Sequence, residues 1–405
     1  MQKLKSNIKK RIGENEYKYV KEVLDTEFRS SKGSMMMTRL EQAFAQRFGT
    51  QYAISHVNGT ATLHSTLEAW GIGKGDEVIV PPLTMSSTTF AVLQANATPV
   101  FADVNPDTFQ IDPIEIEKRI TNKTKAIITV ALFGLCPDMD PIINLAKKYN
   151  LKVLEDNAEC FLGEYKGRLV GTLGDAASFS FQSSKHLTAG EGGIVITNDL
   201  DTAINIRRVS SLGYAGVGAN KGKITKKDIQ DPLYSRHVQM GWNYRMPELC
   251  AAVALAQLEN IDALVERRIE VANLFSEVVK DSDLLVPQYV GKDYKNSYWT
   301  WVVKLNSNKI TWYDFRNKFL ELGGDGIYAA WKLTYLEPMF QNLNLLKRED
   351  FISEENKSMY KQGLCPQAEK IHDKLLQFKT NYWNFDDAIQ QAEILKKTIN
   401  YFDKF

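Results

Sequence analysis

The sequence lacks the features that mark membrane, secreted and nucleic-acid-binding proteins. It has no apolar run long enough to cross a bilayer, and its basic N-terminus contains no apolar stretch of the signal-peptide type. The net charge is only +1 over 405 residues, so no strong basic surface for nucleic acid or an anionic membrane is expected. We therefore expect a cytoplasmic protein that binds neither nucleic acid nor membrane.

Cysteine is scarce, and its four positions are scattered without a Cys-x-x-Cys pair: Cys136, Cys160, Cys250 and Cys365. We interpret them as small apolar residues rather than disulfide partners or zinc ligands, and we expect no metal site. Internal repeats and long linkers rich in proline, glycine or serine are also missing. The length exceeds one ordinary core, so we expect a large domain over residues 1–265, including an N-terminal helical segment, and a smaller domain over 266–405.

Strand and helix patterns alternate from about residue 50 to residue 200. Short apolar runs typical of strands lie at 52–57, 77–80, 99–103, 126–132, 151–156, 177–181 and 194–197. Apolar strands separated by helices predict an α/β fold with a mostly parallel sheet that helices cover on both faces. Strand-like residues 298–303 and an amphipathic helix at 385–402 predict a smaller α+β domain at the C-terminus. Ligands of such parallel sheets bind at the carboxyl ends of the strands.

An acidic residue and a lysine stand where one kind of cofactor chemistry needs them. The strand predicted at 151–156 ends in Glu155-Asp156, and Lys185 follows the strand predicted at 177–181. A pyridoxal phosphate (PLP) enzyme needs a lysine that forms a Schiff base with the cofactor aldehyde. It also needs a carboxylate that keeps the pyridine nitrogen protonated. Either residue alone is more often an ordinary surface or turn residue, so the prediction depends on the order of the surrounding motifs.

Two further segments suit the phosphate of such a cofactor. Asn58-Gly59-Thr60 joins a strand to a helix, where free backbone N–H groups and the helix dipole stabilise an anion. Ser180 can donate its hydroxyl to the same phosphate. The alternatives are an ordinary glycine turn with Thr60 as the helix N-cap, and a polar residue on a strand. Glycines at 216, 218 and 222 do not fit Gly-x-Gly-x-x-Gly, which disfavours a nicotinamide dinucleotide site.

In this order the motifs resemble the DegT/DnrJ/StrS-type sugar aminotransferases, a family of fold-type I PLP enzymes. The resemblance covers roughly residues 25–275 and is carried by segments 58–60, 75–81, 97–103, 133–140, 155–159, 178–193 and 241–246. It implies the fold-type I PLP-transferase fold and PLP as cofactor, with pyridoxamine phosphate as the intermediate form.

The resemblance also implies roles for single residues. Lys185 would be the Schiff-base lysine, and Asp156 would be the partner of the pyridine nitrogen. Asn243 is similar to an asparagine that reaches the phosphate from the neighbouring subunit, which implies a homodimer with shared active sites. The remaining phosphate ligands would come from one helix start and one strand end: Gly59, Thr60, Ala61 and Ser180.

Two positions depart from the usual pattern of the family. Glu159 stands near the ring hydroxyl of the cofactor, at a position that is often glutamine or histidine. A carboxylate there would favour the protonated hydroxyl or aldimine, or raise the pKa of the Schiff base. Met85 stands where an aromatic ring usually stacks on the cofactor, and its thioether can make a sulfur–aromatic contact instead.

The implied reaction moves an amino group from L-glutamate or L-glutamine to a keto-sugar, commonly nucleotide-linked, for polysaccharide or deoxyamino-sugar synthesis. One alternative is a related dehydratase that uses pyridoxamine phosphate and has histidine in place of the lysine. Lys185 is present and His186 is one residue out of register, which favours the aminotransferase. The other alternative is a non-catalytic scaffold, which would not need Lys185, Asp156 and Ser180 together.

The acceptor stays open at the level of the sequence. Residues 326–338 contain no histidine of the kind that the family commonly has near its substrate, so keto-sugar acids and cyclitol ketones remain alongside nucleotide-linked sugars. Candidate substrate residues, which packing would equally explain, are Tyr214, Arg245, Tyr328, Trp331 and Lys332. A basic stretch that suits either a diphosphate or a solvated surface consists of Lys221, Lys223, Lys226 and Lys227.

Overall fold

A seven-stranded sheet forms the centre of the computed structural model, which describes residues 5–28, 33–347 and 349–403. In spatial order its strands are β1 (Tyr52–His56), β9 (Gly193–Thr197), β8 (Ala176–Ser180), β5 (Lys152–Asp156), β4 (Thr124–Val130), β2 (Glu77–Val80) and β3 (Thr98–Phe101). Strand β9 runs antiparallel to both of its neighbours, and all the other pairs are parallel. The predicted mostly parallel sheet is confirmed.

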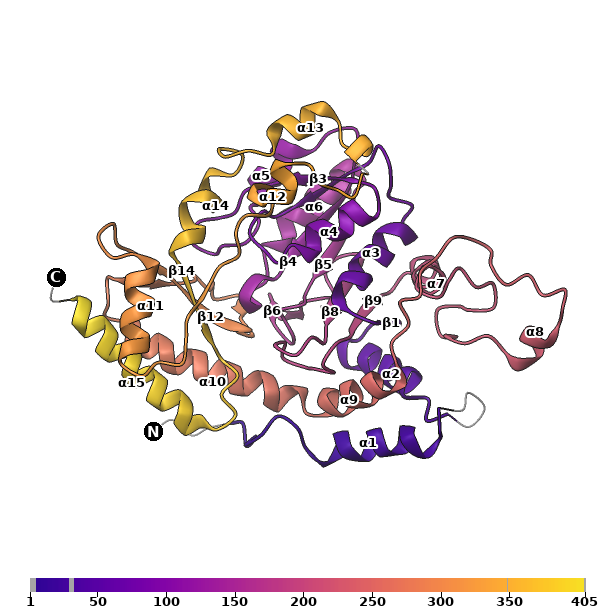
Figure 1. Cartoon of the computed structure of the whole chain (residues 1–405), viewed down its shortest axis with the longest axis horizontal. Helices are drawn as coiled ribbons and strands as arrows, with labels where there is room; N and C mark the ends of the chain where they lie inside the picture. Colours follow the sequence, from indigo (N-terminus) through magenta and orange to yellow (C-terminus); the bar gives the residue numbers. More distant parts are fainter. Residues whose placement is uncertain (1–4, 29–32, 348, 404–405) are drawn as a thin grey trace.

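Helices cover both faces of this sheet, as the apolar strands predict (Figure 1). On one face α3 (Gly59–Ala69), α4 (Ser87–Gln94) and α7 (Leu200–Val209) pack against strand residues such as Val80 and Leu154. The opposite face packs against α2 (Met36–Phe48), α9 (Glu248–Glu259), α5 (Pro113–Arg119) and α6 (Met139–Tyr149). Val153 and Leu154 point to opposite faces, as the two-residue period of a strand requires. Helix α1 (Glu14–Asp25) packs along α9.

A second, antiparallel sheet lies towards the C-terminus. Helix α10 (Ile261–Val279) leads to strands in the order β10 (Leu285–Pro287), β12 (Thr300–Leu305), β14 (Leu375–Lys379) and β13 (Tyr328–Ala329). Helices α11 (Trp312–Glu321) and α15 (Phe385–Phe402) close a separate apolar core with it. The helix predicted at 385–402 is therefore confirmed. The boundary predicted near residue 265 falls inside α10, which continues unbroken to residue 279.

Residues 333–371 leave the second sheet and pack on the first one. They contain η2 (Thr334–Leu336), α12 (Pro338–Gln341), η3 (Glu349–Phe351), α13 (Glu354–Met359) and α14 (Pro366–Ile371). The Tyr360 hydroxyl donates to the carbonyl of Pro99 at 2.8 Å. The N–H groups of Gln367 and Ala368 donate to Asp103 at 2.7 and 2.9 Å. Figure 1 shows α12, α13 and α14 beside β3 and α5. The division of the chain at 265/266 stays a prediction.

An arm formed by residues 211–243 projects from the body between α7 and α9 and carries α8 (Lys226–Gln230) (Figure 1). Single β-bridges join Ser211 to Asn243 and Tyr214 to His237 at its base. Several of its apolar side chains are exposed, above all Leu233 at 88% and Met240 at 77%. No helix in the described ranges is both long enough and apolar enough to span a membrane.

Candidate active site

Asp156 lies at the carboxyl end of β5, where the sequence places it, and is only 4% exposed. Its Oδ2 accepts a hydrogen bond from the Thr88 hydroxyl at 2.8 Å, and its Oδ1 accepts from the N–H of Ala158 at 3.2 Å. Burial raises the pKa of the Asp156 carboxyl, while the bonds from Thr88 and Ala158 and the charge of Lys185 oppose that rise. These contacts fix the direction of the carboxyl group.

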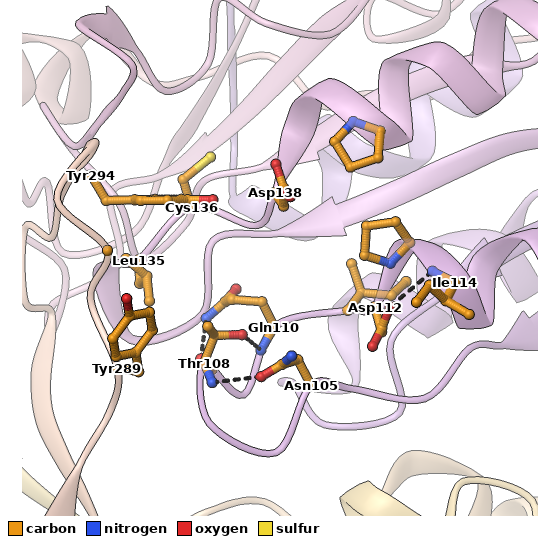
Figure 2. A pocket seen from close by; sticks show the side chains of 14 residues that line it. Asn105, Thr108, Gln110, Asp112, Ile114, Leu135, Cys136, Asp138, Tyr289 and Tyr294 are labelled. Carbon is orange, nitrogen blue, oxygen red and sulfur yellow. Dashed lines mark hydrogen bonds between the residues drawn. The ribbon is translucent and has the colours of Figure 1, made fainter.

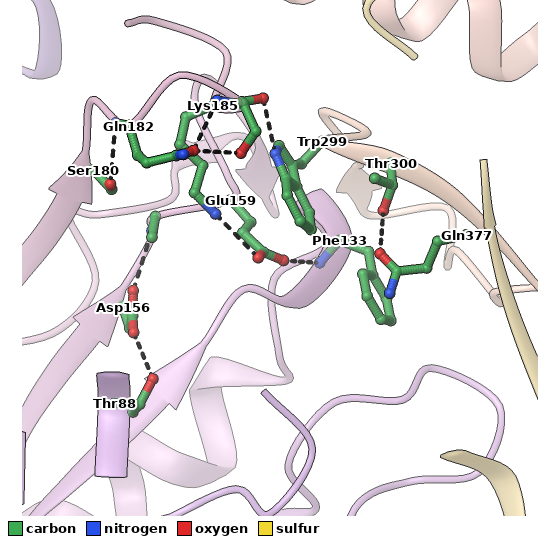
Figure 3. A network of polar contacts seen from close by, with 12 residues as sticks. Thr88, Phe133, Asp156, Glu159, Ser180, Gln182, Lys185, Trp299, Thr300 and Gln377 are labelled. Atoms are coloured by element: carbon green, nitrogen blue, oxygen red, sulfur yellow. Dashed lines mark hydrogen bonds and ion pairs between the residues drawn. The ribbon is translucent and has the colours of Figure 1, made fainter. Parts of the chain in front are cut away.

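Lys185 follows β8 and points at Glu159, as Figure 3 shows. The Nζ of Lys185 lies 3.2 Å from Oε1 of Glu159, and Oε2 of Glu159 accepts the N–H of Phe133 at 3.0 Å. The same Nζ lies 4.1 Å from the centre of the Trp299 ring, a cation–π distance. Burial raises the pKa of Glu159, and the nearby Lys185 cation opposes that rise. The amine is therefore held between a carboxylate and an aromatic face.

The start of α3 meets the end of β8 at the predicted phosphate position. Gly59 is required there, because a Cβ on it would lie 2.9 Å from the Cβ of Ser180. The N-cap is Asn58, not Thr60, and its side chain accepts the N–H of Ala61 at 2.8 Å. The N–H groups of Gly59 and Thr60 belong to the first turn, which offers them no acceptor within the helix. They and the Ser180 hydroxyl form a small site suited to an anion.

These groups line one cavity of about 160 Å³. The predicted residues on its wall are Gly59, Thr60, Met85, Asp156, Glu159, Ser180 and Lys185. Met85 is 49% exposed and lies at the solvent side of the wall. A lysine amine, a buried carboxylate and an anion site thus share one cavity, and this set of groups fits the aldehyde, ring nitrogen and phosphate of PLP.

Other predicted residues lie outside this cavity wall. Asn243 is exposed at the base of the arm. Tyr214 and Arg245 lie near each other there, with the guanidinium 6.0 Å from the ring centre. Lys223 pairs with Glu248 at 3.2 Å. The other lysines of the arm with described side chains are exposed: Lys221 and Lys227. The side chain of Lys226 lies outside the described part of the chain.

The predicted residues of the C-terminal part divide into two groups. Tyr328 on β13 and Lys332 are exposed. Trp331 is partly buried, and its ring stacks with those of Phe133 and Trp299 at centroid distances of 5.9 Å each. Since Trp299 contacts Lys185, Trp331 is connected to the cavity through one intervening ring.

Three residues that the sequence did not single out contribute to the site: Thr88, Phe133 and Trp299. Thr88 orients Asp156, the backbone of Phe133 fixes Glu159, and Trp299 supports Lys185. Thr88 lies in the first turn of α4, in the segment that follows β2. Trp299 lies at the start of an apolar strand pattern and resembles an ordinary core residue.

A second cavity of about 380 Å³ lies between residues 105–114, residues 135–141 and the ring of Tyr289 (Figure 2). None of the predicted site residues lines it. Its two carboxylates are already engaged, because Asp112 accepts the N–H of Ile114 and Asp138 accepts the hydroxyl of Tyr165. No lysine, arginine or histidine lines this cavity, so the chemistry of the first cavity is not repeated there.

Residues 10–374 match the family model of the DegT/DnrJ/EryC1/StrS aminotransferase family. The chain belongs to this family. It is 38% identical over 334 residues to GDP-perosamine synthase of Caulobacter vibrioides, covering 82% of this chain and 86% of that one. It is 41% identical over 284 residues to GDP-perosamine synthase of Escherichia coli O157:H7, covering 70% and 73% of the two chains.

The solved structures agree with this assignment. The aminotransferase from Psychrobacter cryohalolentis superposes with a TM-score of 0.84 at 27% identity, covering 97% of each chain. The predicted fold and family are confirmed. The DegT-family protein described here is an aminotransferase, as the order of its motifs predicts.

Proposed function

We propose that this protein binds PLP in the cavity at the carboxyl ends of β5 and β8 and transfers an amino group to a keto-sugar. One observation carries the proposal. The Lys185 amine, the Asp156 carboxyl group and the first turn of α3 line the same cavity. The match between these three groups and the three functional parts of PLP supports the cofactor assignment.

Each part of the cofactor has a proposed partner. The phosphate is bound by the N–H groups of Gly59 and Thr60 and by the hydroxyl of Ser180. Asp156 would hold the protonated pyridine nitrogen, and the amine of Lys185 would replace the aldehyde oxygen, which leaves as water. The bound cofactor supplies an electron-accepting ring and an aldehyde that takes up an amino group and gives it away.

The side chains then divide the proton chemistry between them. Once the amino donor has displaced it from the cofactor, the Nζ of Lys185 would take the proton from the α-carbon of the donor and deliver it to the cofactor carbon that carried the aldehyde, first as a base and then as an acid. Glu159 holds the lysine as an ammonium group between these steps. A protonated ring nitrogen would give the buried carboxylate of Asp156 a cationic partner. The hydrogen bond from Thr88 keeps that carboxylate aligned.

The proposed acceptor is a nucleotide-linked keto-sugar, and the proposed donor is L-glutamate or L-glutamine. The names of the two relatives describe the synthesis of GDP-perosamine, so a GDP-linked keto-sugar is the first acceptor to test. Proposed substrate contacts are the exposed or partly exposed groups near the arm and the second sheet: Tyr214, Arg245, Tyr328, Trp331 and Lys332.

We propose further that the protein works as a cytoplasmic homodimer in which Asn243 completes the cavity of the partner subunit. Asn243 is exposed and does not line the cavity of its own chain. The arm that ends at Asn243 carries the exposed side chains of Leu233 and Met240. Exposed apolar side chains on one projecting segment are typical of a surface that a second chain covers.

The test uses purified protein loaded with PLP. Adding L-glutamate without an acceptor should remove the visible absorption of the bound cofactor and release 2-oxoglutarate, and Lys185→Ala should show neither change. Adding a GDP-linked keto-sugar should then restore the absorption and give a GDP-linked amino sugar by mass spectrometry. Failure to take up PLP would overturn the proposal. A product that has lost oxygen without gaining nitrogen would favour the dehydratase alternative.

A further inference from the structure

A single buried arginine joins the segment of Lys185 to the second sheet. Arg268 lies on α10 and is 1% exposed. Its Nη2 donates to the carbonyls of Ser184 and Lys185 at 2.9 and 3.1 Å. Its Nη1 donates to the carbonyl of Trp299 at 2.7 Å and to the hydroxyl of Thr380 at 3.1 Å. Trp299 immediately precedes β12 and Thr380 immediately follows β14, so one guanidinium connects both strands to the lysine segment.

Two other side chains bind the same short stretch of backbone. The indole N–H of Trp299 donates to the carbonyl of Ser184 at 3.0 Å, while the face of that indole lies under the Lys185 amine. Arg11, from the N-terminal segment, donates to the carbonyls of Ser183 and Lys185. Three successive carbonyls before and at Lys185 therefore accept hydrogen bonds from groups outside the central sheet.

The two guanidinium groups have no carboxylate partner among the described ion pairs, although Arg268 is buried and Arg11 is partly buried. Their donors go to carbonyl and hydroxyl oxygens, and the Trp383 ring lies within 5.7 Å of Arg11 and 5.8 Å of Arg268. Burial, and then repulsion from Arg11, lower the pKa of Arg268 to about 9, which leaves the guanidinium charged at neutral pH. The Nε of each arginine also has no hydrogen-bond partner. Burying an unpaired cation such as Arg268 costs stability, so stability alone does not account for it.

We infer that Arg268 is a positioning residue for the aminotransferase reaction. Its guanidinium fixes both the backbone from which the Lys185 side chain starts and the ring on which the Lys185 amine rests. The distance between these two points decides where the amine stands relative to Glu159 and the cavity. The inference depends on the proposed role of Lys185 as the group that bonds to the cofactor.

The chain offers a matched control for Arg268 in the preceding residue. Arg267 is 3% exposed, pairs with Glu270 at 3.2 Å and donates to the carbonyls of Trp383 and Ser6 at 2.9 and 3.0 Å. It has no described contact with residues 183–186. Arg267→Lys therefore perturbs the same helix and a comparably buried guanidinium without disturbing the lysine segment.

The experiment measures how fast PLP bonds to the protein. Apo-protein is mixed with PLP, trapped with borohydride at set times, and the peptide containing Lys185 is quantified by mass spectrometry. Arg268→Lys keeps the positive charge but cannot make all four hydrogen bonds of the guanidinium. A misplacement of about 1 Å costs on the order of 100-fold in rate, so we expect trapping and kcat to fall roughly 10- to 100-fold, with KM for glutamate nearly unchanged.

Each outcome has a defined meaning. Arg267→Lys should stay within about twofold of the wild type in both rates. Trp299→Phe keeps an aromatic ring but loses the indole N–H donor. It should slow the trapping of PLP less than Arg268→Lys does. Thermal melting identifies any variant that does not fold. Wild-type rates in Arg268→Lys, or equal losses in Arg267→Lys, would overturn the inference while leaving the proposed function intact. If borohydride fixes no more PLP to the wild-type protein than to Lys185→Ala, the proposed function fails, and this inference fails with it.

Discussion

Lys185 and Glu159 form an ion pair inside the cavity, with 3.2 Å between Nζ and Oε1 and side-chain exposures of 12% and 4%. The carboxylate is fixed, because it also accepts the N–H of Phe133. The lysine is free to leave it, since its other contact is the face of an aromatic ring. The pair therefore holds the amine at a defined place, and the nearby Lys185 opposes the rise that burial causes in the pKa of Glu159.

Replacing Lys185 should change the charge of Glu159. Burial raises the pKa of Glu159 and Lys185 lowers it, so Lys185→Ala removes the main opposing influence and the pKa should rise further. We expect apo Lys185→Ala to show an infrared band of a protonated carboxyl group near neutral pH. The band should vanish in Lys185→Ala with Glu159→Gln. A band that survives the second substitution would assign the proton to another carboxyl group.

Asp156→Asn should stabilise the apo-protein at neutral pH while destroying activity. Burial raises the pKa of Asp156, so the folded chain holds this proton more tightly than the unfolded chain. That contribution is present below the ordinary carboxyl pKa of about 3.9 and is lost as the pH rises through the raised value. Asparagine carries no such charge, so the variant should melt a few °C above the wild type at pH 7.5, and the difference should shrink towards pH 4. Transamination should fall by roughly 100-fold or more.

Asp199 provides a control for the direction of the change in melting temperature expected for Asp156→Asn. Asp199 caps α7 by accepting the N–H of Thr202 at 2.7 Å, and its bonds with Thr202 lower its pKa. Its stabilising contribution is present at neutral pH and is lost as the pH falls through its pKa. Asp199→Asn should therefore lower the melting temperature at neutral pH and have no effect in acid. The same direction of change in both variants would contradict the assignment of burial as the cause at Asp156.

Gly59→Ala should weaken PLP binding without touching any side chain that contacts the cofactor ring. A Cβ at Gly59 would lie 2.9 Å from the Cβ of Ser180 and 3.2 Å from its hydroxyl oxygen, so the helix start and the strand end must separate. Overpacking of this kind costs about 1–3 kcal/mol, which corresponds to roughly a 10- to 100-fold rise in the dissociation constant of PLP if the phosphate site takes the strain. Equilibrium dialysis measures it. Gly218→Ala, with no atom within 4 Å of the new Cβ, should bind like the wild type.

The sequence predicts that Asp156 and Ser180 lie close together, because side chains at the carboxyl ends of neighbouring parallel strands converge. Asp156 ends β5 and Ser180 ends β8, and those two strands are paired. The sequence did not indicate in which direction each strand runs. An apolar run such as 194–197 reads the same in either direction, so the antiparallel course of β9 was not visible before the structure.

The groups that escaped prediction act through backbone atoms or across the two sheets. Arg268 lies in a helical pattern where an arginine usually faces solvent, and only the fold brings it to the carbonyl of Lys185. The N–H of Ala61 donates to the side chain of Asn58, which caps the helix. This N–H is therefore engaged, which competes with its predicted role as a phosphate ligand. Tyr328 and Lys332 were selected because they lie in the segment where the family commonly has a histidine near its substrate, and both are exposed.

The proposed sharing of active sites can be tested by mixing two inactive variants. If Asn243 completes the cavity of the partner subunit, a hybrid of Lys185→Ala and Asn243→Ala chains contains one wild-type site, formed by Lys185 of one chain and Asn243 of the other. Random pairing of equal amounts should then recover about a quarter of wild-type activity, because half of the dimers are hybrids with one good site each. The recovery should require unfolding and refolding of the mixture, and it should be absent when Lys185→Ala is mixed with Asp156→Asn. No recovery with Asn243→Ala would mean that Asn243 acts on the cavity of its own chain, and full activity of Asn243→Ala alone would mean that Asn243 acts on neither cavity.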